Sequence, residues 1–431
     1  MSEALPLGWS VKPLGALAQI VSGGTPSRNE PCFWDEGNIP WVTPTDITAT
    51  PGKYISGSAE NITKQGLRSC SASLLPTGSI LMTSRATLGE TKISTTPVCT
   101  NQGFKSLIAN RGVSNEFLYY QIQRTKQAYA RLGSGSTFLE VGKKDTANFS
   151  VLIPDEGQQV RIADLLSLID SQIEATETLI AKQERVRAGL MQDLFTRGVD
   201  DIGRLRPFRQ QAPQLYHQTE LGWLPKGWEA LPFHKIVDQN RPISYGILMP
   251  GHDVPDGVPV IKVRDIKGGE IIQSGLLRTS KEIDAEYARS RLREGDLLMT
   301  IRGTVGRTAI VPAELAGANI TQDTARLAIA GGSSEYFREY LCSHAAAMYL
   351  QNNTLGNAVQ GINLREVKLM RVPVPPPTEQ AAIAARLTSH RKYSGVLLYE
   401  LEALRLQKSG LMQDLLTGKV SVAPLLERVA A

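Results

Sequence analysis

The sequence predicts an α+β protein in which two domains of mixed α/β structure alternate with two long helices. Three observations favour this fold class. A long helical pattern occurs twice, short strand signals precede each copy, and the order of these signals is the same in both halves. Leu-Met-Gln-Asp-Leu ends both helical patterns, at 190–194 and at 411–415. This identity in matching register indicates an internal, pseudo-twofold repeat.

The helical patterns run from Asp155 to Arg197 and from Thr378 to Lys419. In each copy, seven of ten positions spaced alternately four and three residues apart are apolar, which is typical of a helix that pairs with another helix. We call these the seam positions: Ile162, Leu166, Ile169, Ile173, Thr176, Ile180, Gln183, Arg187, Leu190 and Leu194 in the first copy, and Ile383, Leu387, His390, Ser394, Leu397, Leu401, Leu404, Lys408, Leu411 and Leu415 in the second. At about 1.5 Å per residue, either helix would be roughly 60 Å long. On this pattern alone, the alternative is an ordinary coiled coil that joins two copies of the chain.

The ends of both helices carry stop and start signals. Asp155, followed by Gln158, is expected to cap the first helix, and the prolines at 375–377 precede the second. Gly198 follows the first helix and Gly418 closes the second, where glycine accommodates the left-handed conformation that commonly ends a helix. The two helices are therefore expected to begin and end at corresponding positions of their halves.

Repeated motifs also occur in front of each helix. Leu-Pro-x-Gly-Trp occurs at 5–9 and at 224–228. The apolar run 78–83 recurs at 295–300, and an arginine follows each run two residues later, at Arg85 and Arg302. These runs predict a strand, a basic loop and a second strand. Residues 35–73 have no convincing counterpart in 251–289, so we expect one framework with two different interiors.

Each half continues with a helical signal, at 116–132 and 335–350, then a glycine-rich loop, at 133–137 and 356–358, and a last strand, at 149–153 and 370–374. We therefore expect six segments: 1–153 as the first domain, 154–198 as the first long helix and central spacer, 199–221 as a connector, 222–374 as the second domain, 375–420 as the second long helix and distal spacer, and 421–431 as a C-terminal tail.

Composition fits a globular protein with at least two cores. The chain has 431 residues, 42% of them hydrophobic, and a formal net charge of +5, which gives weak support for an acidic partner. Its four cysteines are scattered, which argues against a disulfide framework and a zinc site. No signal-peptide pattern and no apolar run of about 18 residues is present, so we expect a cytoplasmic protein.

Motifs for catalysis are missing from the sequence. It has no phosphate-binding loop, no GxSxG elbow, no HExxH and no Asn-Pro-Pro-Tyr motif for adenine methylation, and its five histidines are not clustered. We therefore expect no catalytic residue and no metal site, and a binding role is favoured over an enzymatic one.

Taken together, these motifs resemble the specificity subunit of type I restriction-modification enzymes. The resemblance covers nearly the whole chain and rests on the alternation of domains and helices, the Leu-Pro-x-Gly-Trp starts, the arginine loops and the proline-led helices that end in Leu-Met-Gln-Asp-Leu. In the first half it also includes Gly-Gly-Thr-Pro at 23–26, Ile-Pro-Trp-Val at 39–42 and Asp46. The second half lacks the Gly-Gly-Thr-Pro and Pro-Trp stretches, so only its framework carries over.

The resemblance implies that each domain is a target-recognition domain that reads one half of a bipartite sequence in double-stranded DNA. It implies that the long helices pair in an antiparallel coiled coil, set the gap between the halves and dock methyltransferase subunits. Two methyltransferase subunits and the restriction subunits are the implied partners. These partners would carry the adenine methyltransferase and deoxyribonuclease activities and bring S-adenosylmethionine, ATP and magnesium.

Candidate DNA-binding residues are basic or polar side chains on loops, which can reach phosphates or base edges. They are Arg28, Arg85, Lys92, Lys143, Lys144, Arg302, Arg307, Asn363 and Arg365. The alternative for each is an ordinary exposed residue of a surface loop. Trp34, Trp41 and Trp223 are expected in the core or in local packing rather than in base stacking.

Arg187 and Lys408 interrupt both seams at the same point. A shared contact with a partner subunit is one interpretation, and a long side chain that reaches out of the seam is the other. Two rival functions remain for the whole chain: a DNA-binding scaffold or regulator outside restriction-modification, and a cryptic DNA-modifying enzyme.

Overall fold

The computed structural model describes residues 5–134, 139–356, 360–422 and 424. The chain divides into two compact units: residues 1–178 together with 398–431, and residues 179–397. Each unit therefore contains one part of both long helices. Among the described residues, no helix combines the length and the apolar character that a membrane span requires.

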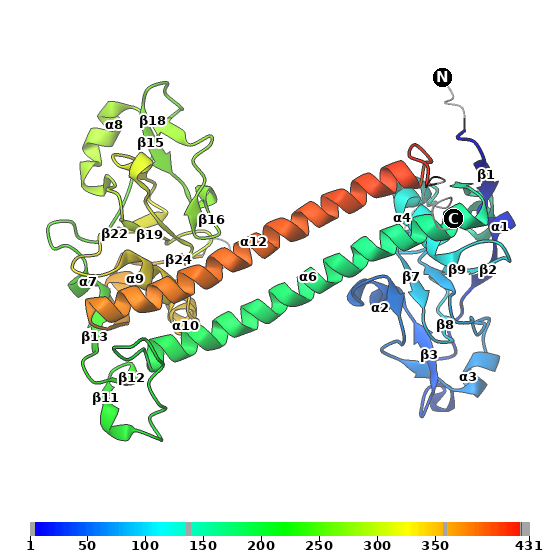
Figure 1. The fold of residues 1–431 in the computed structure, drawn as a ribbon, viewed down its shortest axis with the longest axis horizontal. Helices are drawn as coiled ribbons and strands as arrows, with labels where there is room; N and C mark the ends of the chain where they lie inside the picture. Colours follow the sequence, from blue (N-terminus) through cyan, green and yellow to red (C-terminus); the bar gives the residue numbers. More distant parts are fainter. Residues whose placement is uncertain (1–4, 135–138, 357–359, 423, 425–431) are drawn as a thin grey trace. The chain divides into compact units, whose positions relative to one another are not determined.

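The long helices are α6 (Glu156–Thr196) and α12 (Pro377–Leu415) (Figure 1). The start of α6 is capped as predicted, because the Asp155 carboxylate accepts hydrogen bonds from the backbone N–H of Gln158 at 3.0 Å and from its side chain at 2.6 Å. All twenty seam positions are buried or half-buried. The second helix ends at Leu415, before the predicted Lys419, and a turn leads to Gly418.

In its described residues, the first unit contains ten strands and five short α-helices. The strands are β1 (Ser10–Pro13), β2 (Ala18–Ser22), β3 (Ile39–Val42), β4 (Tyr54–Ile55), β5 (Asn61–Ile62), β6 (Ile80–Met82), β7 (Thr91–Ser94), β8 (Cys99–Thr100), β9 (Lys105–Ala109) and β10 (Ser150–Ile153). The helices are α1 (Leu14–Leu17), α2 (Pro44–Ala49), α3 (Lys64–Arg68), α4 (Asn115–Ala130) and α5 (Lys143–Asn148).

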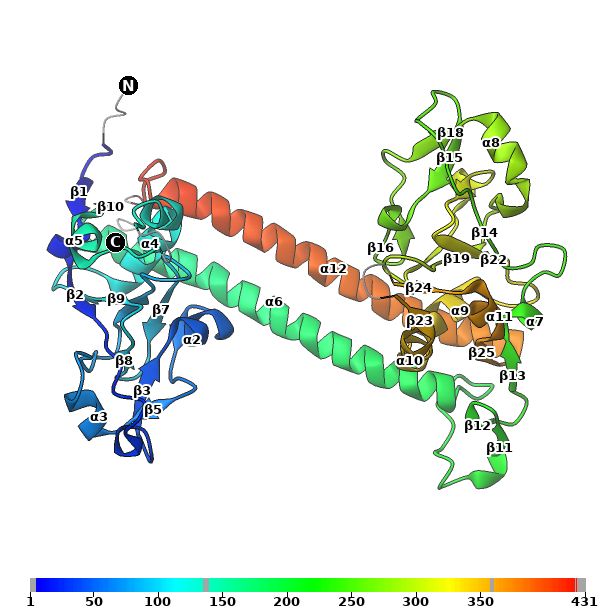
Figure 2. The same cartoon turned by 180° about the vertical axis from the view of Figure 1, so that it is seen from behind.

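Two sheets and a strand pair organise the first unit. The larger sheet has the order β2-β9-β6-β7-β4, the smaller one has the order β5-β3-β8, and β1 pairs with β10. Helix α4 packs over the larger sheet (Figures 1 and 2). Buried residues of α4, α6 and the end of α12 share one core cluster, in which Phe117, Leu166 and Leu415 are at most 4% exposed. The long helices are thus part of the domain core.

Outside residues 357–359, the second unit contains fifteen strands and five short α-helices. The strands are β11 (Tyr216–Thr219), β12 (Gly222–Pro225), β13 (Glu229–Pro232), β14 (Ser244–Tyr245), β15 (Val258–Ile261), β16 (Ile266–Lys267), β17 (Glu270–Ile271), β18 (Leu277–Thr279), β19 (Leu297–Thr300), β20 (Thr308–Ile310), β21 (Asn319–Ile320), β22 (Thr324–Leu327), β23 (Thr354–Leu355), β24 (Gly361–Ile362) and β25 (Arg371–Val374). The helices are α7 (Phe233–Ile236), α8 (Lys281–Glu286), α9 (Ser334–Leu341), α10 (His344–Asn353) and α11 (Leu364–Leu369).

The larger sheet of the second unit has the order β14-β22-β19-β20, the smaller one has the order β18-β15-β21, and β13 pairs with β25. Helix α9 packs against β20. Buried residues from both long helices enter the core here as well, including Leu194 and Leu387, each with no exposed area.

The smaller sheets correct one expectation. Strand β3 pairs antiparallel with β5 and parallel with β8, and β15 pairs antiparallel with β18 and parallel with β21. An aspartate follows each central strand and accepts a hydrogen bond from the backbone N–H three residues before it: Asp46 from Thr43 at 2.7 Å, and Asp265 from Lys262 at 2.9 Å. Residues 35–73 therefore do have a structural counterpart in 251–289, at least around the central strand.

One further expectation was wrong. The helical signal at 335–350 forms two helices, because Ser343 caps a second one with its hydroxyl oxygen, which accepts from Ala346 N–H at 3.2 Å. Trp223 is 43% exposed and lies beneath the guanidinium of Arg209, so of its two expected places it has local packing and not the core. Trp41 is buried as expected and donates from its indole N–H to the Gly24 carbonyl at 2.9 Å.

Candidate nucleic-acid interface

The two arginine loops have the same hydrogen-bonded framework. After β6, the Thr83 carbonyl accepts from Gly89 N–H at 2.9 Å, and after β19 the Thr300 carbonyl accepts from Gly306 N–H at 2.9 Å. Both glycines have positive φ, 80° and 89°, which favours glycine at this point. The threonine hydroxyl oxygens accept further bonds from Glu90 N–H and Arg307 N–H, at 3.0 and 2.9 Å. Each loop thus holds its arginine two residues beyond the threonine.

The two loop arginines differ in their electrostatic surroundings. Arg85 forms an ion pair with Glu140 at 2.8 Å, and Lys105 approaches the same carboxylate at 3.3 Å. Partial burial acts to raise the pKa of Glu140, but hydrogen bonds from Arg85 and Lys105 outweigh it and hold that pKa below its usual range. Arg302 is exposed, and no ion pair to it is formed within the part of the chain that the structure describes.

Three predicted DNA-binding residues are engaged within the protein. Lys92 is 9% exposed and donates to the Gly52 carbonyl, and burial lowers its pKa. The Arg307 guanidinium donates to the carbonyls of Val263 and Ile266 at 3.4 and 3.3 Å. Arg28 pairs with Glu60 and lies 3.8 Å from the centre of the Trp34 ring. Their roles in DNA binding stay predictions.

The remaining candidates lie at the starts of short helices. Lys143 and Lys144 are exposed in the first turn of α5. Asn363 caps α11 through its side-chain oxygen, which accepts from Arg365 N–H at 2.9 Å, and both side chains are exposed. Most of the glycine-rich loops beside them, 135–138 and 357–359, lies outside the described residues.

Two glutamine turns, not singled out as sites from the sequence, lie beside the arginine loops. Ser84 N–H donates to the Gly103 carbonyl at 2.7 Å, and Arg302 N–H donates to the Asp323 carbonyl at 3.3 Å. A glutamine immediately precedes each accepting residue: Gln102 precedes Gly103, and Gln322 precedes Asp323. The sequence signal that could have identified these turns is the match between Thr-Asn-Gln at 100–102 and Ile-Thr-Gln at 320–322. A 340 Å³ pocket in the second unit is lined by Gln322 together with Lys262 and Arg264.

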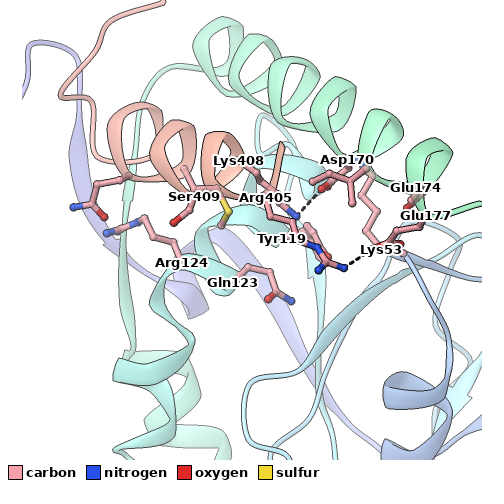
Figure 3. Close-up of a pocket in the computed structure, with 14 residues that line it drawn as sticks. Lys53, Tyr119, Gln123, Arg124, Asp170, Glu174, Glu177, Arg405, Lys408 and Ser409 are labelled. Carbon is pink, nitrogen blue, oxygen red and sulfur yellow. Dashed lines mark hydrogen bonds and ion pairs between the residues drawn. The ribbon is translucent and has the colours of Figure 1, made fainter. Parts of the chain in front are cut away.

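The two seam cations are held by carboxylates of the same chain. Lys408 forms an ion pair with Asp170 at 2.6 Å (Figure 3). Asp170 also accepts a hydrogen bond from the Tyr120 hydroxyl at 2.7 Å. Arg187 pairs at 2.8 Å with Glu339, which is 1% exposed. Burial, and then the hydrogen bond to Asp170, raise the pKa of Tyr120. A partner contact by Arg187 or Lys408 stays a prediction.

Comparison with known families identifies the family to which a chain with these features belongs. Residues 6–185 and 252–396 match the family described as the type I restriction modification DNA specificity domain. The chain belongs to this family. Both matched stretches include an arginine loop and part of a long helix, so the family match covers the framework of both halves.

Individual specificity subunits match over much of the chain. The chain is 31% identical over 276 residues to the specificity subunit of the type I restriction enzyme MjaIX from Methanocaldococcus jannaschii, across 63% of this chain and 61% of that relative. It is 26% identical over 349 residues to the EcoBI specificity subunit from Escherichia coli, across 74% and 72%. The match thus spans somewhat less than two thirds of the archaeal relative's length.

Solved structures share the fold of this family member. The S subunit of a type I restriction-modification system from M. genitalium aligns with a TM-score of 0.59 at 13% identity, over 96% of this chain and 98% of that one. A chain from a structure of a type I R-M system, concerned with complex assembly and conformational transition, aligns with a TM-score of 0.55 at 17% identity, over 97% and 100%. At these identities the likeness concerns the fold alone.

Proposed function

We propose that this chain is the DNA sequence-recognition subunit of a type I restriction-modification complex. It binds a bipartite target in double-stranded DNA and directs adenine methylation and restriction by methyltransferase and restriction subunits. The chain contributes recognition and no catalysis, and S-adenosylmethionine, ATP and magnesium belong to the partner subunits. One observation carries this proposal: both units of this member of the specificity-domain family contain an arginine loop with the same hydrogen-bonded framework.

The long helices hold the two domains as an antiparallel coiled coil in this proposal. Two ion pairs within the first unit support that direction: Asp170 with Lys408 at 2.6 Å, and Glu177 with Arg405 at 2.7 Å. From the first pair to the second, the residue number rises from 170 to 177 on α6 and falls from 408 to 405 on α12, which is the pattern of helices that run in opposite directions. The burial of all seam positions and the like strand orders of the two larger sheets further support a pseudo-twofold repeat.

Each domain would contact DNA through the arginine loop and the turn beside it. Arg302 and Arg85 would contact phosphate or guanine, and Gln322 and Gln102 would read a base edge, since a glutamine amide pairs with adenine in the major groove. Lys143, Lys144, Asn363 and Arg365 would hold the DNA backbone at the helix starts. Arg28, Lys92 and Arg307 would then support these contacts from within the domain.

The proposal is tested by purifying the chain with and without an Asn-Pro-Pro-Tyr methyltransferase subunit and mapping methylated adenines on genomic DNA. Methylation at a split motif, only when both proteins are present, is the expected result. Methylation by the chain alone would instead indicate a cryptic enzyme. Binding of duplex DNA with no effect on a methyltransferase would favour a scaffold or regulator outside restriction-modification.

A further inference from the structure

A 510 Å³ pocket in the second unit lies where α6, α9 and α12 meet the β16–β17 hairpin and the loop before β20. Its charged lining consists of five basic and two acidic side chains: Arg187, Lys267, Arg307, Arg338 and Arg391, with Glu184 and Glu339. Both the surplus of positive charge and its degree of burial distinguish this pocket from an ordinary basic surface.

One buried carboxylate is shared by three guanidinium groups. Glu339, 1% exposed, pairs with Arg187 at 2.8 Å and with the neighbouring Arg338, and it lies 3.6 Å from the Nε of Arg391. The Arg338 side chain is only 6% exposed. A single negative charge cannot neutralise three partly desolvated cations, and uncompensated charge at low solvent exposure is costly.

Arg391 shows the deficit in its hydrogen bonding. Its Nε is buried, and among the described residues it has no hydrogen-bond acceptor. The other carboxylate near Arg391 is Glu270, 3.7 Å away and 81% exposed, where solvent screening weakens the attraction. The Arg391 side chain is 26% exposed in all, so its weakly paired guanidinium group can meet an acceptor from outside the chain.

The pocket wall leaves room beside these guanidinium groups. Gly268 and Gly269 form the tip of the β16–β17 hairpin with φ of 60° and 83°. A Cβ on Gly269 would lie 3.8 Å from a terminal nitrogen of Arg338 and 3.9 Å from one of Arg391. The glycine backbone therefore borders both arginines without a side chain between them.

The corresponding pocket of the first unit provides an internal comparison. That 540 Å³ pocket is lined by four basic side chains, Lys53, Arg124, Arg405 and Lys408, and by three acidic ones, Asp170, Glu174 and Glu177 (Figure 3). Its seam cation, Lys408, has Asp170 as its own carboxylate at 2.6 Å. At the position that corresponds to Asp170 by the offset of 221, the second half has Arg391. Basic side chains therefore outnumber acidic ones by three in the pocket of the second unit and by one in the pocket of the first.

We propose that the pocket of the second unit is a binding site for a phosphate group. Planar guanidinium groups donate paired hydrogen bonds to phosphate oxygens, and a dianion supplies the two negative charges that the Glu339 cluster lacks. The volume suits a phosphate carried on a small ester. A free phosphate ester and a DNA backbone phosphate share this chemistry, and the site does not depend on the function proposed above.

The test follows thermal unfolding of the full chain with inorganic pyrophosphate, against sodium chloride at equal ionic strength. A ligand that binds the folded state raises the unfolding midpoint in a saturable way. We expect this rise for the wild type. Arg391→Gln should weaken pyrophosphate binding about tenfold, since one charge-assisted hydrogen-bonding group is lost. Lys267→Gln, an exposed lining residue, should weaken it less.

A second variant supplies the missing charge within the chain. Ser394 lines the pocket one turn beyond Arg391 on α12, and residues three apart on a helix are neighbours. Ser394→Glu should raise the midpoint without ligand and abolish the response to pyrophosphate. Arg405→Gln removes an α12 arginine from the pocket of the first unit, where it pairs with Glu177, and should respond like the wild type. A wild type without a saturable response, or an equal loss in Arg405→Gln, would overturn the proposal.

Competition then identifies the source of the phosphate. Displacement of pyrophosphate by adenosine monophosphate but not by a short nonspecific duplex indicates a free ester, whereas displacement by the duplex indicates the DNA backbone. Failure of both competitors against bound pyrophosphate would contradict a site for phosphate esters. Because these measurements need no methylation target, they are separable from the recognition function.

Discussion

At the scale of single residues, the repeated Leu-Pro-x-Gly-Trp motif closes the end of a long helix in each unit. Trp9 packs against Gly418, after α12, where a Cβ would lie 2.8 Å from the indole ring. Trp228 packs against Gly198, after α6, and its indole N–H donates to Glu379 at 2.9 Å. Each motif thus packs its tryptophan against the glycine that follows the end of a long helix.

Gly198→Ala is expected to destabilise the chain by about 2–4 kcal/mol, because positive φ and overpacking both oppose a side chain there. Gly198 has φ of 60°, and its Cβ would lie 2.2 Å from the Glu379 carboxylate and 2.4 Å from Trp228. Gly222 has φ of 91°, and a Cβ added to it would meet no described residue beyond its chain neighbours within 4 Å, so Gly222→Ala isolates the backbone cost, about 1 kcal/mol. Denaturant unfolding measures both, and equal losses would contradict the packing argument.

Glu140→Gln should increase the affinity for nonspecific duplex DNA severalfold at neutral pH. The change removes a negative charge beside the arginine loop and frees Arg85 from its ion pair. Fluorescence anisotropy at fixed salt measures the affinity, and Glu177→Gln, which frees Arg405 on α12, is the matched control. An unchanged affinity for Glu140→Gln would remove Arg85 from the proposed interface.

The lowered pKa of Glu140 also predicts a pH dependence. A carboxylate whose pKa is lower in the folded state contributes stability above its ordinary value, near 4.5, and loses that contribution as pH falls through the lowered value. The wild type should therefore lose more stability than Glu140→Gln between about pH 5 and pH 3. Parallel unfolding curves for the two proteins over this range would contradict the assignment.

At the scale of elements, the sequence predicted what periodicity and identity can show. The heptad pattern located α6 and α12 because burial along one seam imposes a period, and the repeated apolar runs located β6 and β19. The correspondence of β3 and β15 was missed because Ile-Pro-Trp-Val and Val-Pro-Val-Ile share only the proline. The partner strands define that position, and strands elsewhere in the sequence are not visible in these four residues.

The candidate site was predicted less well than the fold. Loop position identified Arg85 and Arg302, but composition cannot tell an exposed cation from one that serves an internal contact, as Lys92 and Arg307 do. The burial of Lys92 depends on Gly52, forty residues away in the sequence. Long-range contacts of this kind decide which basic residues remain available to DNA.

Replacing residues 35–73 with the same region of a relative should change one half of the recognised motif only. This region contains β3, α2, β4, β5 and α3 of the first unit. The donor segment should keep Lys53, because its ammonium pairs with Glu116 and donates to Ser167 on α6, both at 2.6 Å. Methylation mapping gives the readout, and a change in both halves of the motif would contradict modular recognition.

At the scale of the whole molecule, the paired helices are proposed to set the distance between the two halves of the DNA target. Both units contain part of α6 and part of α12, and the boundaries lie between Thr178 and Leu179 and between Leu397 and Leu398. A change at these two points leaves the contacts within each unit intact. It therefore isolates the length of the helix pair from the structure of the domains.

Inserting three heptads at both boundaries should lengthen the gap in the DNA target by about nine base pairs. Twenty-one helical residues add roughly 31 Å, close to one turn of DNA at about 34 Å, so each domain again faces its groove. One heptad adds only about 10 Å and turns the second half-site to another side of the duplex, so binding should weaken. Selection of bound sequences from a pool of random DNA duplexes measures the gap and the binding for both insertions. The control is the same insertion in α6 alone, which shifts the seam positions of α6 out of register with those of α12. An unchanged gap after the paired insertion would show that the helices do not set the spacing.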